Sequence, residues 1–225
     1  MIKQDLTQID DLTGFYIRKV FLEHFARLLE QARSSPGDKP LSIAMFDIDH
    51  FKTINDNFGH GGGDDWLVGI TNCVNEQIGD RAICFRYGGD EFILLMPAVE
   101  REQAFLMAER FRQAVSQLTV TLSDGRTISG NTTSIGVASF PVDGRTAVEL
   151  VRKADHALYR AKVAGRNQVR LAFEERMVPK TAHFTQTQLE RLTSLANERG
   201  VSEADLLREA MDDLLTKYGV NDIES

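Results

Sequence analysis

The spacing of hydrophobic and polar positions changes several times along the chain and predicts a mixture of strands and helices. Two short apolar runs, 82–85 and 92–96, are typical of buried strands, and two adjacent glycines between them favour a tight turn. A third run, 41–46, predicts another buried strand and leads directly into the acidic stretch 47–52. Acids therefore adjoin buried strands at two separate places, where α/β and α+β folds commonly carry their chemistry.

Apolar residues at helical or strand spacing, and turn residues between them, predict the remaining elements. In chain order these are a first helix with Val20, Phe21, Phe25, Leu28 and Leu29 on its apolar face, a short helix after residue 52, an amphipathic helix over 66–78, a helix over 99–118, a two-stranded excursion over 119–129, a strand over 132–138, a helix over 148–164 and a last strand over 169–173. Three successive glycines, 61–63, are expected to form a turn or to allow a close approach.

Length and composition narrow the class of protein. The 225 residues suffice for one domain of about 170 residues and a small appendage. A net charge of −7 argues against nucleic-acid binding by the whole surface, although a local basic patch remains compatible with it. Cys73 and Cys84 are expected to be buried free thiols. The polar N-terminus and the lack of a long apolar run predict a soluble, cytoplasmic protein without a membrane partner.

Two pairs of residues are candidates for ion and phosphate binding. If the strands next to Asp47 and Asp90 are neighbours, the two carboxylates can share a hard divalent cation such as Mg²⁺, although each acid alone can simply cap a turn. Lys162 and Arg166 are four residues apart on a predicted helix and its end, so they are expected on one face, where they can clamp phosphates. A solvated basic helix end is the alternative.

A third pair, Asn55 and Asp64, has the chemistry to read a purine edge. An amide both donates and accepts hydrogen bonds, whereas a carboxylate only accepts them. Each residue alone would be interpreted as part of a turn. These candidates gain weight from occurring together.

These stretches together resemble the GGDEF domain of diguanylate cyclases, from about Asp10 to Phe173. The matching pieces are Asp10-Asp11-Leu12-Thr13-Gly14, Phe46-Asp47-Ile48-Asp49-His50-Phe51-Lys52, Asn55-Asp56, Gly59-His60, Gly63-Asp64, Arg86-Tyr87-Gly88-Gly89-Asp90-Glu91-Phe92, Ser134-Ile135-Gly136-Val137-Ala138, Asp155, Ala157, Tyr159, Ala161-Lys162 and Gly165-Arg166-Asn167. The combination is far more specific than any one motif.

The resemblance implies an α+β fold like the palm of nucleotidyl cyclases, with a mostly antiparallel sheet flanked by helices. It implies condensation of two GTP into cyclic di-GMP with loss of two pyrophosphates, by a dimer in which two sites face each other. Asp47, the Ile48 carbonyl and Asp90 would hold Mg²⁺, with Mn²⁺ as an alternative ion. Asp90 or a metal-held group would help to deprotonate the attacking hydroxyl, and Glu91 would support the same site.

The resemblance also assigns substrate-binding roles. Asn55 and Asp64 would recognise guanine, and relatives that also make cyclic AMP-GMP lack an acid at the second position, so GTP is expected. Gly88 and Gly89 would let the nucleotide approach the turn. The triphosphate would be bound by the backbone after Asp49 and by the residues Phe51, Lys52, Lys162 and Arg166.

One departure from the family pattern concerns inhibition by the product. Many members carry Arg-x-x-Asp before the glycine pair and bind cyclic di-GMP there. In this chain the two positions are Gly79 and Ala82, while Asp80 and Arg81 lie nearby in the wrong order. We therefore expect no product inhibition through that site.

The chain is expected to divide into a cyclase domain over 1–173, a linker over 174–179 and a small unit over 180–219. The small unit resembles a ribbon-helix-helix domain, a class of obligate dimers in which each chain contributes one strand to a ribbon. The unit is too small to bury its two apolar helical stripes by itself. The parallel lies in Ala182-His183-Phe184, Leu189, Leu192, Leu195-Ala196, Gly200-Val201-Ser202 and Leu206-Leu207-Arg208-Glu209-Ala210.

In repressors of the ribbon-helix-helix class, outward strand residues enter the DNA major groove. Thr181 and His183 are candidates for base contact here, and Lys180 for phosphate contact. However, residues 176–225 contain six Lys or Arg against nine acids, which disfavours DNA binding. A homodimer through this unit is therefore favoured over a dimer that also binds DNA, with docking on the chain's own cyclase domain as the third alternative.

The alternative to an active cyclase is a DNA-binding transcriptional regulator whose GGDEF domain only senses GTP or cyclic di-GMP. A weaker reading is a scaffold that uses the fold for protein contact. The intact acidic motif, with Asp47, Lys162 and Arg166, favours the enzyme, because a sensor could lose these residues freely.

Overall fold

The computed structural model describes residues 8–34, 39–172, 182, 184–199 and 201–218. Its internal contacts divide the chain into two compact units, 1–175 and 176–225. None of the described helices is long and apolar enough to cross a membrane.

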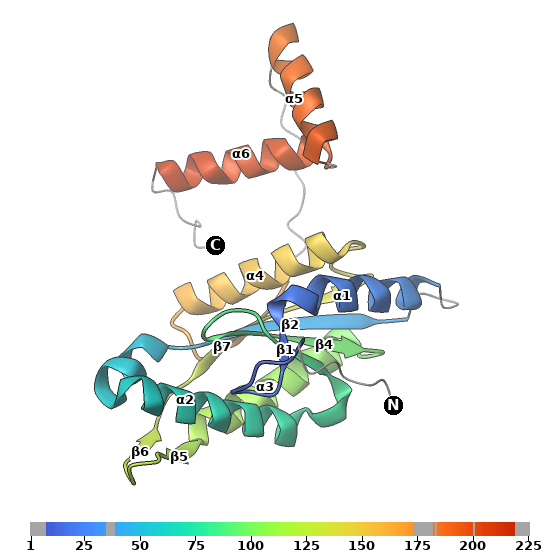
Figure 1. The fold of residues 1–225 in the computed structure, drawn as a ribbon. Coiled ribbons are helices and arrows are strands. Elements are labelled where there is room, and N and C mark those ends of the chain that lie inside the picture. The colour runs from blue at the N-terminus through green and yellow to red at the C-terminus, as the bar shows by residue number, and fades with distance from the viewer. Residues whose placement is uncertain (1–7, 35–38, 173–181, 183, 200, 219–225) are drawn as a thin grey trace. The chain divides into compact units, whose positions relative to one another are not determined.

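The first unit is built on one mixed six-stranded sheet (Figure 1). The strand order is β1-β3-β4-β2-β7-β8, and a separate two-stranded sheet pairs β5 with β6. The strands are β1 Tyr16–Ile17, β2 Leu41–Ile48, β3 Ile83–Arg86, β4 Glu91–Pro97, β5 Thr119–Thr121, β6 Thr127–Ser129, β7 Thr133–Phe140 and β8 Val169–Leu171. The outermost pairs, β1 with β3 and β7 with β8, are parallel, and the inner pairs are antiparallel.

Helices cover both faces of this sheet. They are α1 Arg18–Arg33, α2 Phe51–Gln77, the short 3₁₀ helix η2 Gly79–Arg81, α3 Arg101–Gln117 and α4 Ala147–Val163. Figure 1 shows α1 and α4 on one face, and α2 and α3 on the other. All eight residues of the central strand β2 are buried, because the strand pairs on both edges and is covered on both faces.

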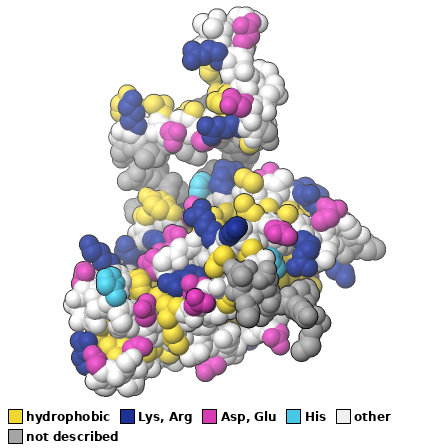
Figure 2. Space-filling model, viewed as in Figure 1, with side chains coloured by type: hydrophobic (Ala, Val, Ile, Leu, Met, Phe, Trp, Pro, Cys, Tyr) yellow, Lys and Arg dark blue, Asp and Glu magenta, His cyan; other side chains and the backbone are white. Residues whose placement is uncertain are grey.

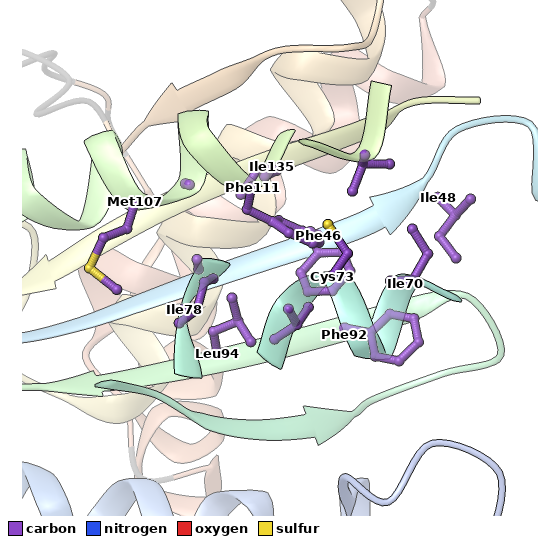
Figure 3. Close-up of a cluster of buried hydrophobic side chains, with 14 of the residues drawn as sticks. Phe46, Ile48, Ile70, Cys73, Ile78, Phe92, Leu94, Met107, Phe111 and Ile135 are labelled. Atoms are coloured by element: carbon purple, nitrogen blue, oxygen red, sulfur yellow. The ribbon is translucent and has the colours of Figure 1, made fainter. Parts of the chain in front are cut away.

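Side chains that alternate along β2 enter two different cores. Ala44, Phe46 and Ile48 pack with residues of α2 and α3, whereas Ile43 and Met45 pack with residues of α1 and α4. Figure 3 shows the first core, in which the ring of Phe46 lies among side chains from the facing helices and neighbouring strands. The Phe46 ring stacks on Phe92 with centroids 5.0 Å apart and meets the edge of Phe111 at 4.9 Å.

The expected elements of the first unit are present, with three differences. The glycines 61–63 lie inside α2 instead of in a loop, and the helix breaks only at Gly59, where φ is 76° and ψ is 172°. The two-residue strand β1 was not predicted, because so short a run carries no periodicity. Helix α4 begins at a capping box between Thr146 and Glu149, which the prediction also missed.

The second unit consists of two described helices, α5 Gln186–Arg199 and α6 Glu203–Lys217. Helix α5 begins at a capping box: the Gln188 backbone N–H donates to Thr185 Oγ1 at 3.3 Å, and the Thr185 N–H donates to Gln188 Oε1 at 2.9 Å. The linker over 174–179 and the DNA-contact candidates Lys180, Thr181 and His183 lie outside the described residues.

Candidate active site

The ends of β2 and β4 bring the predicted acids together. Asp47 is in register with Glu91 on β4, and the Ile48 backbone N–H donates to the Asp90 carbonyl at 3.3 Å. The pairing of β2 with β4 therefore makes residues 47–48 and 90–91 neighbours, although they are far apart in the sequence.

Lys162 of α4 completes this group of charges. Its Nζ lies 2.8 Å from Asp47 Oδ2. Burial raises the pKa of the Asp47 carboxyl above its ordinary value, the Lys162 ammonium opposes the rise, and the nearby carboxylates of Asp90 and Glu91 add to it. Negative charge is therefore concentrated here against one lysine, an arrangement that favours a further cation.

The turn between β3 and β4 is held by hydrogen bonds within its own backbone and by Arg86, which also pairs with a remote acid. The N–H groups of Tyr87 and Gly88 both donate to the Glu91 carbonyl, at 2.8 and 3.0 Å. Arg86 donates to the Gly89 carbonyl at 2.9 Å and forms an ion pair with Asp10 at 3.0 Å. A Cβ at Gly88 would lie 2.8 Å from Glu91 Oε2, so a larger residue here would require the Glu91 side chain to shift.

Asp10 thus has a role that sequence reasoning missed. It accepts hydrogen bonds from the Thr13 backbone N–H at 2.9 Å and from its hydroxyl at 2.7 Å. Burial tends to raise the pKa of Asp10, but the bonds from Thr13 and Arg86 outweigh it and the pKa is lowered. In the sequence Asp10 stands out only as part of a family motif, and its contact with Arg86 spans 76 residues.

Asn55 and Asp64 lie on the two sides of the break in α2. Asn55 is half-buried before Gly59, and Asp64 is exposed after it. Gly63 packs so closely on the Asn55 amide oxygen that a Cβ there would overlap it. The glycine run therefore serves a close approach within a helix, which was one of the two expectations.

The prediction that Lys162 and Arg166 share a helix face is wrong. Lys162 is in the last turn of α4, but Arg166 follows the end of that helix and has a left-handed backbone with φ of 63°. Its N–H donates to the Ala161 carbonyl at 2.9 Å, and its side chain is exposed. The two cations therefore come from a helix and from the loop that follows it.

Two further candidates adjoin the acids at the start of α2. His50, which also has a left-handed backbone, precedes the helix, and Phe51 and Lys52 begin it. Phe51 packs partly against the first core, whereas Lys52 is exposed. Lys52 is therefore free to contact a solvent-side group, while Phe51 presents mainly its backbone.

The donors available for a metal ion are oxygens. In the described part of the chain, no three acids, histidines or cysteines lie close enough together to hold an ion by themselves. Two carboxylates and a backbone carbonyl fit Mg²⁺, which usually binds one or two protein carboxylates and completes its shell with phosphate oxygens and water. The donor set therefore suits an ion that arrives with a phosphorylated substrate.

The second unit leaves its apolar side chains uncovered. Leu189, Leu195, Leu207, Met211 and Leu214 are between 39% and 54% exposed, and Figure 2 shows hydrophobic side chains on the visible surface of this unit. Among the described residues of the two helices, only Ala196 and Leu206 are buried. The described residues of a single copy therefore form almost no core.

Comparison with known proteins matches both units. The model of the diguanylate cyclase GGDEF domain matches residues 7–168, and the model of the ribbon-helix-helix domain matches 178–219. The response regulator PleD of Caulobacter vibrioides is 36% identical over 165 residues, which cover 73% of this chain and 36% of PleD. Diguanylate cyclase A of Treponema denticola is 37% identical over 172 residues, covering 75% of this chain and 45% of that protein. The chain thus spans less than half of the length of these relatives.

Solved structures give the same result. The GGDEF domain of PA1120 (TpbB or YfiN) from Pseudomonas aeruginosa superimposes with a TM-score of 0.69 at 34% identity, covering 73% of this chain and 94% of that one. The GGDEF domain of DgcB from Caulobacter crescentus, solved in complex with c-di-GMP, gives 0.67 at 30% identity, with 76% and 96% covered. The chain therefore belongs to the GGDEF family of diguanylate cyclases and carries a ribbon-helix-helix domain after the GGDEF domain.

Proposed function

We propose that this protein condenses two GTP molecules into cyclic di-GMP and releases two pyrophosphates. The observation that carries the proposal is the meeting of Asp47, Asp90 and Lys162 at one end of the sheet. In each half-reaction the 3′-hydroxyl oxygen of one GTP attacks the α-phosphorus of the other. The bond from that phosphorus to the bridging oxygen breaks, and the hydroxyl proton passes to a base.

The chain's own residues supply cations and orientation. Lys162 and Arg166, together with Lys52, would balance the charge of the triphosphate, since each carries a positive charge beside or near the acidic group. Asp47, the Ile48 carbonyl and Asp90 would hold Mg²⁺, with Mn²⁺ as an alternative. When bound, the ion would neutralise charge that develops on the transferring phosphate.

Asn55 and Asp64 would select the base. A carboxylate at position 64 accepts hydrogen bonds from the N1–H and the exocyclic amine of guanine, and adenine offers no such pair of donors. Asn55 is supported by Gly63, which leaves room for its amide. Selection of GTP over ATP is therefore part of the proposal.

The dimer needed for two reciprocal attacks would form through the second unit. The exposed leucines of α5 and α6 support this, because apolar stripes on so small a unit are normally covered by a partner. A chain truncated after Phe173 is expected to lose activity on dilution and to regain it at high concentration. In the full chain, Leu207→Glu should have the same effect, while Glu209→Gln, a change at an exposed polar residue of the same helix, should not.

We also propose that the enzyme lacks the primary product-inhibition site. Position 79 is a glycine with φ of 57°, and position 82 is an alanine. The neighbouring Arg81 directs its guanidinium to the carbonyls of Ile78 and Gln77, both at 3.4 Å, at the end of α2. Strong non-competitive inhibition in a cyclic di-GMP titration would contradict this part of the proposal.

The experiment that tests the main proposal is identification of the product by mass after incubation of the purified chain with GTP and Mg²⁺. A mass equal to cyclic di-GMP is the expected result, and no product at any protein concentration would overturn it. ATP in place of GTP serves as the control for base selection.

The ribbon-helix-helix match favours one alternative, a DNA-binding regulator in which the GGDEF domain only senses a nucleotide. A gel-shift assay with the DNA upstream of the gene, with and without GTP, separates the two. Nucleotide-dependent DNA binding without turnover would support the regulator.

A further inference from the structure

Asp49 lies two residues after Asp47 and has no role in the proposed chemistry. Its side chain is almost completely buried, with 2% exposed, and accepts three hydrogen bonds. The donors are the Thr132 hydroxyl at 2.6 Å, the Ser134 hydroxyl at 2.7 Å and the Asn167 backbone N–H at 3.1 Å. A buried carboxylate with this many donors is held in one orientation.

The three donors come from separate parts of the chain. Thr132 and Ser134 lie just before and inside β7, and Asn167 belongs to the loop between α4 and β8. The Asp49 backbone N–H also donates to the Thr132 carbonyl at 2.9 Å. Asp49 therefore fastens the end of β2 to the start of β7 and to the loop that carries Arg166.

That loop has a backbone that needs such support. Arg166 and Asn167 both have left-handed conformations, with φ of 63° and 48°, which cost free energy in residues other than glycine. The Gln168 amide holds the other side of the loop by donating to the carbonyls of Ala161 at 3.1 Å and Ala164 at 2.9 Å. Asp49 is thus the contact between this strained loop and the strand that carries Asp47.

We propose that Asp49 is a positioning residue that sets the distance between the phosphate-binding loop and the acids at the end of β2. The inference rests on the proposed function, because it assumes that Arg166 and Lys162 bind phosphate. Asp49 itself touches no substrate in this scheme. Its loss would leave the Asp47 and Arg166 side chains present but would free the loop that carries Arg166 to move relative to the strand.

The other end of β7 offers a matched control, just after the strand ends. Asp143 is a fully buried carboxylate that accepts a hydrogen bond from the Ser139 backbone N–H at 2.8 Å and lies 3.5 Å from Arg101. Asp49→Asn and Asp143→Asn both replace a buried carboxylate next to β7, and only the first lies at the candidate site.

The test measures binding of two probes to the full chain. The first, 3′-deoxy-GTP with Mg²⁺, carries the triphosphate but lacks the attacking hydroxyl, and the second, 3′-deoxyguanosine, lacks phosphates. Asp49→Asn is expected to weaken the binding of 3′-deoxy-GTP by about 10- to 100-fold, which is the range for residues that orient a metal-ligating group. Binding of 3′-deoxyguanosine should be unchanged, and Asp143→Asn should affect neither probe.

A milder variant covers the case in which Asp49→Asn does not fold. Thr132→Val keeps the shape of the side chain and removes one of the three donors, so a smaller loss for 3′-deoxy-GTP alone is expected. Equal losses for both probes, or no loss in either variant, would overturn the inference while leaving the proposed function intact. If the wild-type chain binds no 3′-deoxy-GTP, both the inference and the proposed function are overturned.

Discussion

The two ends of the central sheet use buried polar groups in opposite ways. At the end formed by Ser42, Ser139 and Asp143, each polar group finds a partner inside the protein. The Ser42 hydroxyl contacts the Ser139 hydroxyl at 2.6 Å and donates to the Val99 carbonyl at 2.8 Å. Asp143 forms an ion pair with the Arg101 guanidinium. Burial raises the pKa of Asp143, and the Ser139 N–H and Arg101 oppose the rise. The charge at this end is balanced internally.

The other end collects four acids, Asp47, Asp49, Asp90 and Glu91. Of the residues that the structure describes, only Lys162 forms an ion pair with any of them. Carboxylates brought together without equal positive charge cost free energy, and a fold keeps such an arrangement where a ligand supplies the missing charge. Burial of acids therefore does not distinguish the two ends; the shortage of paired positive charge does.

The largest expected effect comes from the acids of the unbalanced end. Asp47→Asn or Asp90→Asn should lower turnover of GTP by about a hundredfold or more, because each removes a charge that the reaction needs. Pyrophosphate release measures the loss, and circular dichroism should show an unchanged fold. Asp143→Asn is the control and should keep wild-type turnover. Wild-type activity in either site variant would remove the distinction between the two ends.

A smaller effect is expected where the site extends into α2. Gly63→Ala places a methyl group against the Asn55 amide, so the KM for GTP should rise by about tenfold, the effect of roughly one lost hydrogen bond. Gly61→Ala, two residues earlier in the same helix, meets open space and should leave the KM unchanged. The same KM in both variants would show that Asn55 does not read the base.

Substitutions at the balanced end should lower the stability of the fold without changing turnover. Ser42→Ala leaves the Val99 carbonyl and the Ser139 hydroxyl without their partner and should lower the free energy of unfolding by about 1–3 kcal/mol. Urea denaturation measures this, and Ser116→Ala is the matched control, at a partly buried serine of α3 whose bond to the Gln113 carbonyl is exposed to solvent. A loss of turnover without a loss of stability would contradict the division between the ends.

The smallest effect concerns the two cysteine thiols, Cys73 of α2 and Cys84 of β3. Burial raises the pKa of Cys84 to about 12, and burial together with the Glu76 charge raises that of Cys73 to about 11. Both groups are therefore protonated thiols at pH 8 and should resist iodoacetamide in the folded chain, with no change in activity. Mass spectrometry counts the added groups, and unfolding in urea should expose both. Rapid alkylation of the native protein would show that these side chains are accessible.

Local patterns predicted the buried strands, the main helices and the acids that follow the strands. They did not predict the Asp49 contacts, because the donors lie 83 to 118 residues away and leave no trace in local periodicity. The run 61–63 left a turn and a close approach open, because glycine weakens helices, and the structure has the close approach, with Gly63 packed on Asn55 inside α2. Arg166 was expected on the face of Lys162 because of the four-residue spacing, but the helix ends before Arg166 and the left-handed backbone there breaks that spacing.

The position of β2 limits how such a site can be controlled. Asp47 belongs to a strand that is paired along both edges and covered on both faces, so its amide is expected to exchange with solvent deuterium only when the whole domain opens. Local unfolding of this strand would therefore cost too much free energy to serve as a switch. Under the proposed function, control of the output would instead act on loops, on access, or on how often two GGDEF domains meet.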